Sequence, residues 1–145
     1  MTECSDSHID RLLVNGHCDT LAHVQGLLHG WPGLAVDDPR YGLPPPLFTF
    51  TETLSWFSQA IRSGGWTYFE ATPTQRQSAL LDDLREMAPG DVVRRYEEGI
   101  WHWQDESVMG NHDRWVRANE SACNRWLHAL LRRNRDELQK VLVSG

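Results

Sequence analysis

The stretch RSGGWTYFEATPTQ, residues 62–75, decides how the middle of this chain folds. Its two adjacent glycines, Gly64 and Gly65, follow a helical pattern, and a glycine can adopt the left-handed conformation that ends a helix. Aromatic side chains come next, and their large apolar area favours burial. We therefore expect a helix end at the glycines, followed by an aromatic plug in which Trp66 and Phe69 enter the core.

The second half of the same stretch predicts the start of another helix. Thr72, Pro73 and Gln75 stand in the order of the N-cap, N1 and N3 positions of a capping box, where the N–H that proline lacks has no helical partner. Four apolar residues then recur at helical spacing before Pro89-Gly90 ends the pattern: Leu80, Leu81, Leu84 and Met87.

Apolar residues at spacings of three and four predict helices on both sides of this stretch. They indicate one helix over residues 6–28, divided at Asn15-Gly16, and a second over residues 50–62. Asp91 can cap a further helix. Its inward residues are expected to be Val92, Val93, Tyr96 and Ile100.

The last helical region is expected over residues 111–143. Its apolar residues keep helical spacing, but one unbroken helix of that length is unusual, so we expect a break near Ser121 or Asn134. Residues 101–113 precede this region and are expected to form a turn.

The remaining segment, residues 29–47, breaks every periodic pattern. Its five prolines exclude a long helix or a central strand, while its apolar residues indicate an ordered loop that lies against the body of the protein. No segment of the chain alternates convincingly with period two. The sequence therefore predicts an all-α fold in which residues 1–145 form a single compact domain of five or six helices.

Length and composition indicate one globular domain of ordinary size. The chain has 145 residues, of which 40% are hydrophobic and 23% charged, and no window approaches the roughly 18 apolar residues of a membrane span. No basic segment followed by an apolar run opens the sequence, so we expect no secretory signal. Cys4, Cys18 and Cys123 are odd in number and far apart, which argues against a disulfide framework and predicts a cytoplasmic location.

The net charge of −6 is unevenly distributed. Residues 1–60 and residues 61–113 each carry −5, whereas residues 114–145 carry +4. The overall acidity argues against a general nucleic-acid binder, which needs excess positive charge for phosphate contacts. The basic residues of the last segment are typical of a helix C-terminus, where they complement the helix dipole.

No pattern in the sequence predicts a catalytic, metal or cofactor site. Zinc sites need a short pair of ligands and a distant second pair, and the chain has no such arrangement. The GHCDT segment, residues 16–20, places a histidine beside a cysteine, but neighbours on a helix point about 100° apart and do not form a catalytic pair by adjacency. The alternative left open is a small metal-dependent enzyme that uses His102, His112 and Asp113 near the expected turn.

A series of acidic residues gives the sharper prediction. It begins on the helix that follows Thr72 and continues to the expected turn, where two tryptophans are candidate aromatic anchors for a partner. Arg94 and Arg95 stand three residues before Glu97 and Glu98, so part of this charge is neutralised locally. The predicted partner-binding residues are Asp82, Asp83, Glu86, Glu97, Glu98, Trp101, Trp103, Asp105 and Glu106.

The opening stretch also resembles a known family. Gly64, Gly65, Trp66 and Phe69, followed by the ALLDDLREMAP helix, are similar to the signature of the DNA-mimic-like proteins, a family of small acidic all-helical bacterial domains. In that signature an asparagine precedes two glycines and a phenylalanine, where this chain has Ser63 and Trp66. The resemblance covers residues 50–100 and implies an all-α fold, no enzyme activity and acidic residues displayed to a DNA-binding protein.

These observations predict a non-enzymatic interaction module. Its acidic helical surface would bind a basic protein, such as a nucleic-acid-binding protein, a nuclease or a toxin, and it would act as an inhibitor, immunity protein or regulator. The alternatives are the metal-dependent enzyme and a homodimeric structural module. In the homodimer, basic residues of the C-terminal region would meet the acidic body of a second copy: Arg125, Arg132, Arg133 and Arg135.

Overall fold

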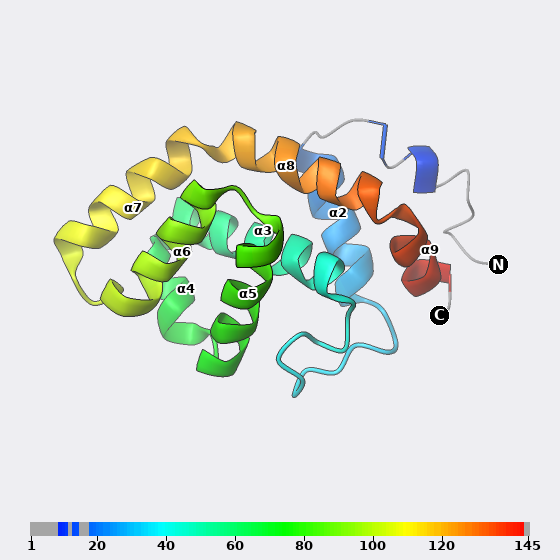
Figure 1. Ribbon diagram of the computed structural model, residues 1–145, viewed down its shortest axis with the longest axis horizontal. Helices are drawn as coiled ribbons and strands as arrows, with labels where there is room; N and C mark the ends of the chain where they lie inside the picture. Colours follow the sequence, from blue (N-terminus) through cyan, green and yellow to red (C-terminus); the bar gives the residue numbers. More distant parts are fainter. Residues whose placement is uncertain (1–8, 12, 15–17, 144–145) are drawn as a thin grey trace. The chain divides into compact units, whose positions relative to one another are not determined.

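A computed structural model describes residues 9–11, 13–14 and 18–143, which contain helices, turns and loops but no strand (Figure 1). The predicted all-α class is confirmed for this part of the chain. The predicted count of five or six helices is wrong, because a short helical segment at residues 9–11 is followed by eight further helices. Their bounds are α2 Cys18–His29, α3 Pro45–Ser63, α4 Gly65–Ala71, α5 Thr74–Met87, α6 Gly90–His102, α7 Glu106–Ala118, α8 Glu120–Arg133 and α9 Arg135–Val143.

The additional helices arise where the sequence predicted a plug, a turn or one long helical region. Helix α4 occupies the expected aromatic plug, and α7 begins at Glu106, inside the expected turn. The region 111–143 is divided at Asn119 and at Asn134, so the break predicted near Asn134 is confirmed and the other lies two residues before Ser121. Each asparagine donates its side-chain amide to the carbonyl four residues earlier, which satisfies a C-terminal acceptor of the helix that ends there.

The contacts within the chain define two compact units. Unit 1 comprises Met1–Thr51 together with Ala122–Gly145, and unit 2 comprises Glu52–Ser121. Both divisions fall inside helices, in α3 and in α8. The expectation of a single domain over residues 1–145 stays a prediction, and each unit is described by itself.

Unit 1 packs α2 against α9 and buries apolar stripes from α2, α8 and α9. The stripes follow the spacing of three and four residues on which the helices were predicted. They consist of Leu21, Val24 and Leu28 on α2, Cys123, Leu127, Leu130 and Leu131 on α8, and Leu138 and Val141 on α9.

The proline-rich segment of unit 1 is shorter than predicted because α3 begins at Pro45 and not at residue 50. The first-turn N–H groups of a helix have no helical partner, so prolines at its start remove no hydrogen bond. The loop that remains is ordered, as expected: the Asp38 carboxylate accepts hydrogen bonds from the backbone N–H groups of Arg40 and Gly42. The Tyr41 ring packs between those of His29 and Phe48, which fixes the loop on the unit.

In unit 2, one aromatic residue of helix α4 does not lie where the sequence predicted. Tyr68 and Phe69 are buried, whereas Trp66 is 45% exposed and does not enter the core as predicted. The reason is helical phase, because a seven-residue helix that buries Gly65, Tyr68 and Phe69 turns Trp66 and Glu70 toward solvent.

The paired glycines have two separate functions in this unit. Gly64 has φ 99° and ψ 140°, a conformation open to glycine, and it ends α3 as predicted. Gly65 permits a close approach, because a Cβ there would lie 2.6 Å from His112 Cε1 and 2.8 Å from Asp113 Oδ1. The Gly65 N–H donates to that Asp113 oxygen at 2.9 Å, which joins the start of α4 to α7.

The predicted capping box does not form. Thr72 ends α4, with its N–H donating to the Tyr68 carbonyl, and Pro73 is the N-cap of α5 without a side-chain hydrogen bond. The Gln77 side chain connects the two helices instead, because its amide donates to the carbonyls of Phe69 and Thr72 at 2.8 Å each. The buried Gln77 side chain therefore satisfies carbonyl acceptors at the end of α4, and it does not take the place of the N-cap that the sequence predicted for α5.

The starts of α6 and α7 also differ from their predictions. Pro89 is the N-cap of α6, so Asp91 lies within the first turn and does not cap it. Asp105 caps α7, with its carboxylate accepting from the N–H groups of Ser107 and Val108. The expected turn over residues 101–113 is consequently reduced to residues 103–105.

Candidate functional site

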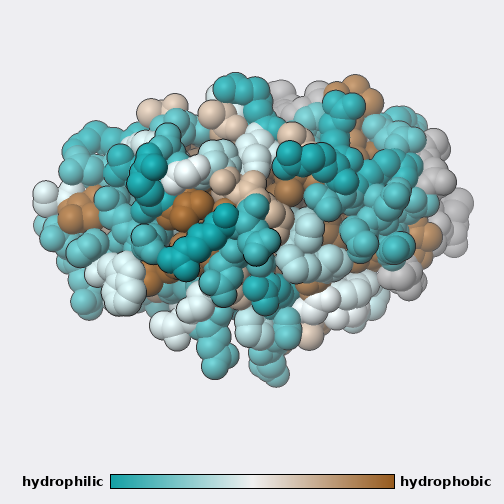
Figure 2. All heavy atoms as spheres, in the orientation of Figure 1, coloured by the Kyte–Doolittle hydropathy of each residue, from teal (hydrophilic) through white to brown (hydrophobic). Residues whose placement is uncertain are grey.

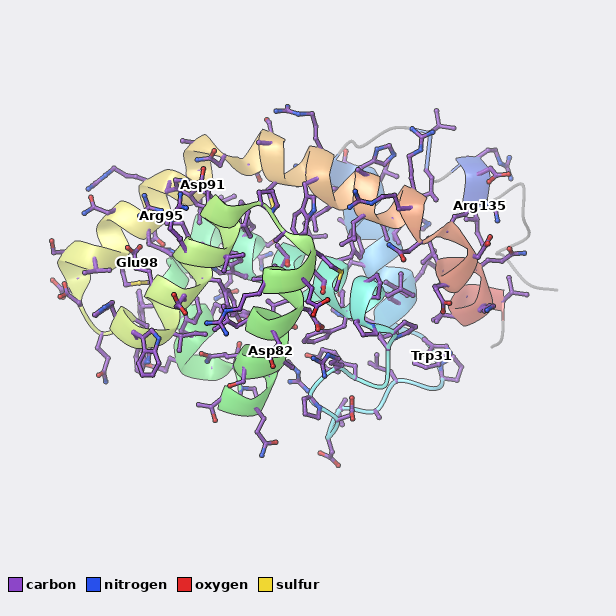
Figure 3. All side chains as sticks on the ribbon, viewed as in Figure 1. Trp31, Asp82, Asp91, Arg95, Glu98 and Arg135 are labelled. Atoms are coloured by element: carbon purple, nitrogen blue, oxygen red, sulfur yellow. The ribbon has the colours of Figure 1, made fainter. Side chains whose placement is uncertain are left out.

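The predicted acidic series lies on α5, α6 and the start of α7, all within unit 2. Helices α5 and α6 lie side by side, and Figure 3 shows Asp82 on the first and Asp91 and Glu98 along the second. Asp82 and Glu86 are exposed. Asp83 is 6% exposed, so its carboxylate is not displayed to a partner and it does not belong to the predicted surface.

Most of this exposed charge is neutralised by arginines. Arg85 on α5 contacts Glu97 on α6 at 2.7 Å and Asp82 at 3.9 Å. Within α6, Arg95 pairs with Glu98 at 3.2 Å, as its spacing predicted, whereas Arg94 pairs with Asp91 and not with Glu97. Hydrophilic side chains cover much of these helices in Figure 2. They include arginines as well as acids, which form the ion pairs described above. The three arginines therefore offset part of the negative charge of this face, on which Glu86 forms no ion pair among the described residues.

Acidic residues without such partners border a pocket elsewhere in unit 2. The pocket has a volume of about 420 Å³, is open to solvent, and is lined by α4, by the turn after α6, and by α7. We call it the acidic–aromatic pocket, and its lining residues are Trp66, Glu70, Trp103, Gln104, Glu106 and Met109.

The lining combines a buried apolar residue with exposed acidic and aromatic ones. Met109 is 3% exposed and forms part of the buried core, while Trp66 keeps nearly half of its surface accessible. Glu70 and Glu106 are exposed, and among the described residues neither carboxylate forms an ion pair. Two negative charges beside accessible indole surface form an environment that attracts a cation.

The sequence predicted two of the six lining residues, Trp103 and Glu106. It missed Trp66 because the residue was assigned to the core, and it missed Glu70 because the plug was not recognised as helical. The spacing of four residues between Trp66 and Glu70 is the signal that places both on one helix face. Trp101, the other predicted anchor, is 74% exposed near the end of α6 and does not line the pocket.

The histidine of the alternative metal site has a structural role in the core. His112 is fully buried, and its Nε2 lies 3.1 Å from the Trp56 indole N–H, which can only donate. His112 Nε2 must therefore accept, and Nδ1 must carry the proton that is donated to Asp113 Oδ1 at 2.9 Å. Burial lowers the pKa of His112, while the hydrogen bond to Asp113 opposes that shift.

This arrangement leaves no lone pair of His112 for a metal ion. His102 is exposed on α6, and among the described residues no group of three or more His, Cys, Asp or Glu side chains is placed to hold a metal. The GHCDT segment lies partly outside the described residues.

A second buried polar network joins three helices of unit 2. Tyr68 donates from its hydroxyl to Glu52 Oε2 at 2.6 Å, so the Tyr96 hydroxyl, 2.8 Å from that of Tyr68, must be the donor in the second bond. Burial raises the pKa of Glu52, and the hydrogen bond from Tyr68 and the nearby Arg76 oppose this shift. All three residues of the network are buried, so it stabilises the packing of α3, α4 and α6.

In unit 1, the basic C-terminal region is only partly available for a partner. Arg135 at the start of α9 forms an ion pair with Asp10 at 2.6 Å. Arg125, Arg132 and Arg133 are exposed on α8. The homodimer alternative therefore depends on three arginines and not on the predicted four.

No family model, curated protein or solved structure matches this chain. Among the described residues, no helix combines the length and the apolar character needed to cross a bilayer. A function can therefore be inferred only from the pocket and from the charges of the residues that line it.

Proposed function

We propose that the protein is a non-enzymatic interaction module that binds a basic protein through unit 2. The proposed partner is a nucleic-acid-binding protein, a nuclease or a toxin, and the protein acts on it as an inhibitor, immunity protein or regulator in the cytoplasm. The binding face is centred on the acidic–aromatic pocket, with the exposed Trp101 of α6 as a further aromatic anchor.

The distribution of charge between the units supports this proposal. Unit 2 contains twelve acidic and seven basic residues, a net charge of −5, whereas unit 1 contains eight acidic and seven basic residues, a net charge of −1. Almost all of the excess negative charge therefore belongs to one unit. An acidic surface of this kind accelerates encounter with a basic partner and selects against acidic ones.

The observation that carries the proposal is the pairing pattern of the carboxylates. The acids on the α5–α6 face are largely matched by arginines, whereas Glu70 and Glu106 remain unmatched beside accessible tryptophan. Tryptophan is enriched among the residues that dominate protein–protein binding energy. The resemblance of residues 50–100 to the DNA-mimic-like family favours the same class of partner.

The proposal is tested by affinity capture from cell extract with wild-type protein and two double variants. Glu70→Gln with Glu106→Gln removes the unmatched charges, and Asp82→Asn with Glu86→Gln removes the same charge from exposed positions on α5. We expect a basic protein to be captured by the wild type and the control, and to be lost with the pocket variant. The purified pair should bind more weakly at about 0.5 M than at about 0.05 M salt.

Two results would overturn the proposal. One is a captured partner whose binding is unchanged by salt and by both double variants. The other is a catalytic activity of the purified protein toward a small molecule, with no protein captured under any condition.

A further inference from the structure

We propose that the acidic–aromatic pocket receives one arginine side chain of the partner. This inference rests on the proposed function and specifies the chemical group that the site recognises.

The charge of the pocket lining determines that the occupant is a cation. Glu70 projects from α4 and Glu106 from the first turn of α7, so carboxylates from two different helices contribute to one pocket. The lining contains no lysine or arginine that competes for them. A cation that enters the pocket therefore gains two attractive partners without displacing an existing ion pair, which reduces the cost of binding.

The remaining lining residues match the other parts of an arginine side chain. The accessible indole of Trp66 offers a face on which a planar guanidinium stacks, and the Gln104 side chain adds a carbonyl acceptor. The buried Met109 provides an apolar contact for the methylene groups. A lysine ammonium has no plane to stack and is more strongly hydrated, so the same lining favours arginine.

The pocket is large enough to admit an arginine side chain. Its volume of about 420 Å³ is near the lower end of the range of roughly 300–1,000 Å³ typical of small-molecule sites. An arginine side chain occupies part of such a space, and the remainder is left for water or for neighbouring groups of the partner.

The experiment uses three blocked amino acids as probes: N-acetyl-arginine-N-methylamide and its lysine and citrulline counterparts. Citrulline has the shape of arginine without its charge. Binding is followed by NMR through the indole N–H resonances, of which those of Trp66 and Trp103 are assigned with the variants Trp66→Phe and Trp103→Phe. We expect the arginine probe to shift these two resonances saturably, the lysine probe to bind more weakly, and the citrulline probe to leave both unchanged.

The charge variants provide the matched control. Glu70→Gln and Glu106→Gln should each weaken the arginine probe about tenfold, the effect of losing one charge-assisted contact. Asp82→Asn and Glu86→Gln, exposed acids on α5, should leave its affinity unchanged. Thermal unfolding and the dispersion of the other indole resonances verify that every variant is folded.

The inference is overturned if citrulline shifts the two indoles as strongly as arginine, or if the α5 variants weaken the probe as much as the pocket variants do. Binding of lysine that equals or exceeds that of arginine also overturns it, because the site would then recognise charge alone. The two proposals fail separately. Salt-dependent capture of a partner that survives Glu70→Gln and Glu106→Gln rejects the arginine pocket alone, whereas specific arginine binding without any basic partner rejects the interaction module.

Discussion

Replacing Gly99 by alanine tests whether the packing of α6 against α4 is as close as the structure shows. Gly99 is buried within α6, three residues before the helix ends, and a Cβ at this position would lie 2.8 Å from Phe69 Cδ2 and still closer to Cε2 and Cζ. The Phe69 ring cannot easily withdraw, because it packs against the rings of Trp56, Tyr96 and His112.

Two opposing effects set the expected magnitude. Alanine in place of glycine inside a helix stabilises by about 1 kcal/mol. Extra volume in a well-packed core costs about 1–3 kcal/mol. The Cβ of Gly99→Ala would lie well within the van der Waals contact distance of the Phe69 ring carbons, which places this variant at the upper end of that range. The net expectation is a loss of about 2 kcal/mol in the free energy of unfolding, the difference between these two effects.

A glycine on the neighbouring helix provides the control. Gly110 also lies inside a helix, α7, but the nearest atom to a Cβ there is Arg114 Nη1 at 4.0 Å, the end of a flexible side chain. Gly110→Ala should therefore stabilise the protein by about 0.5–1 kcal/mol. The two substitutions are chemically identical and have opposite expected signs, so they separate packing from helix propensity.

The assay is urea unfolding followed by circular dichroism, with midpoints compared at constant slope. Thermal midpoints should differ between the two variants by roughly 6–12 °C, since 1 kcal/mol corresponds to about 2–4 °C at this chain size. The double variant Gly99→Ala with Phe69→Leu should lose less stability than the sum of its single changes. Leucine lacks the ring atoms of Phe69 that the new methyl group would overlap. Equal stability of Gly99→Ala and Gly110→Ala would refute the reasoning.

Three further changes test other features of unit 2. Because burial lowers the pKa of His112, this side chain takes up a proton at a higher pH in the unfolded chain than in the folded protein. The free energy of unfolding should therefore fall as the pH drops below about 6.5. An NMR titration of the folded protein that gives His112 a pKa at or above that value contradicts this prediction. Glu52→Gln keeps an acceptor for the Tyr68 hydroxyl and removes a buried charge, so urea unfolding should show a more stable variant at pH 7. Because burial raises the pKa of Glu52, this advantage should shrink toward pH 4, and a variant less stable at pH 7 argues against it. Gly64→Ala should lose about 1–3 kcal/mol, since Gly64 has a φ of 99° that alanine rarely adopts; an unchanged thermal midpoint would mean that the turn tolerates a side chain.

Helical periodicity predicted much of the fold. Leu80 and Leu84 are buried on α5, and Leu54 and Phe57 are buried on α3, at the spacings that identified these helices. Periodicity missed α4, because seven residues between a glycine pair and a proline are too few to show a repeat. Because no helix was predicted there, Trp66 was assigned to the core, whereas it is 45% exposed on α4.

The candidate site was less predictable because it depends on contacts distant in sequence. The acids of α5 and α6 are visible in the sequence, but the ion pair between Arg85 and Glu97 spans twelve residues and two helices. Only the structure shows that the charge of this face is partly neutralised. Glu70 and Glu106 likewise acquire a common environment through the packing of α4 against α7, for which the sequence contains no local signal.

The division into units has a consequence for the order in which the chain folds during synthesis. Unit 2 is one unbroken run, Glu52–Ser121, whereas unit 1 is completed only by residues 122–145. A ribosome adds roughly 5–20 residues per second, and domains generally fold as units as they emerge. Unit 2 therefore has all of its own contacts available before residues 122–145 are synthesised, whereas unit 1 can complete its contacts only after they are.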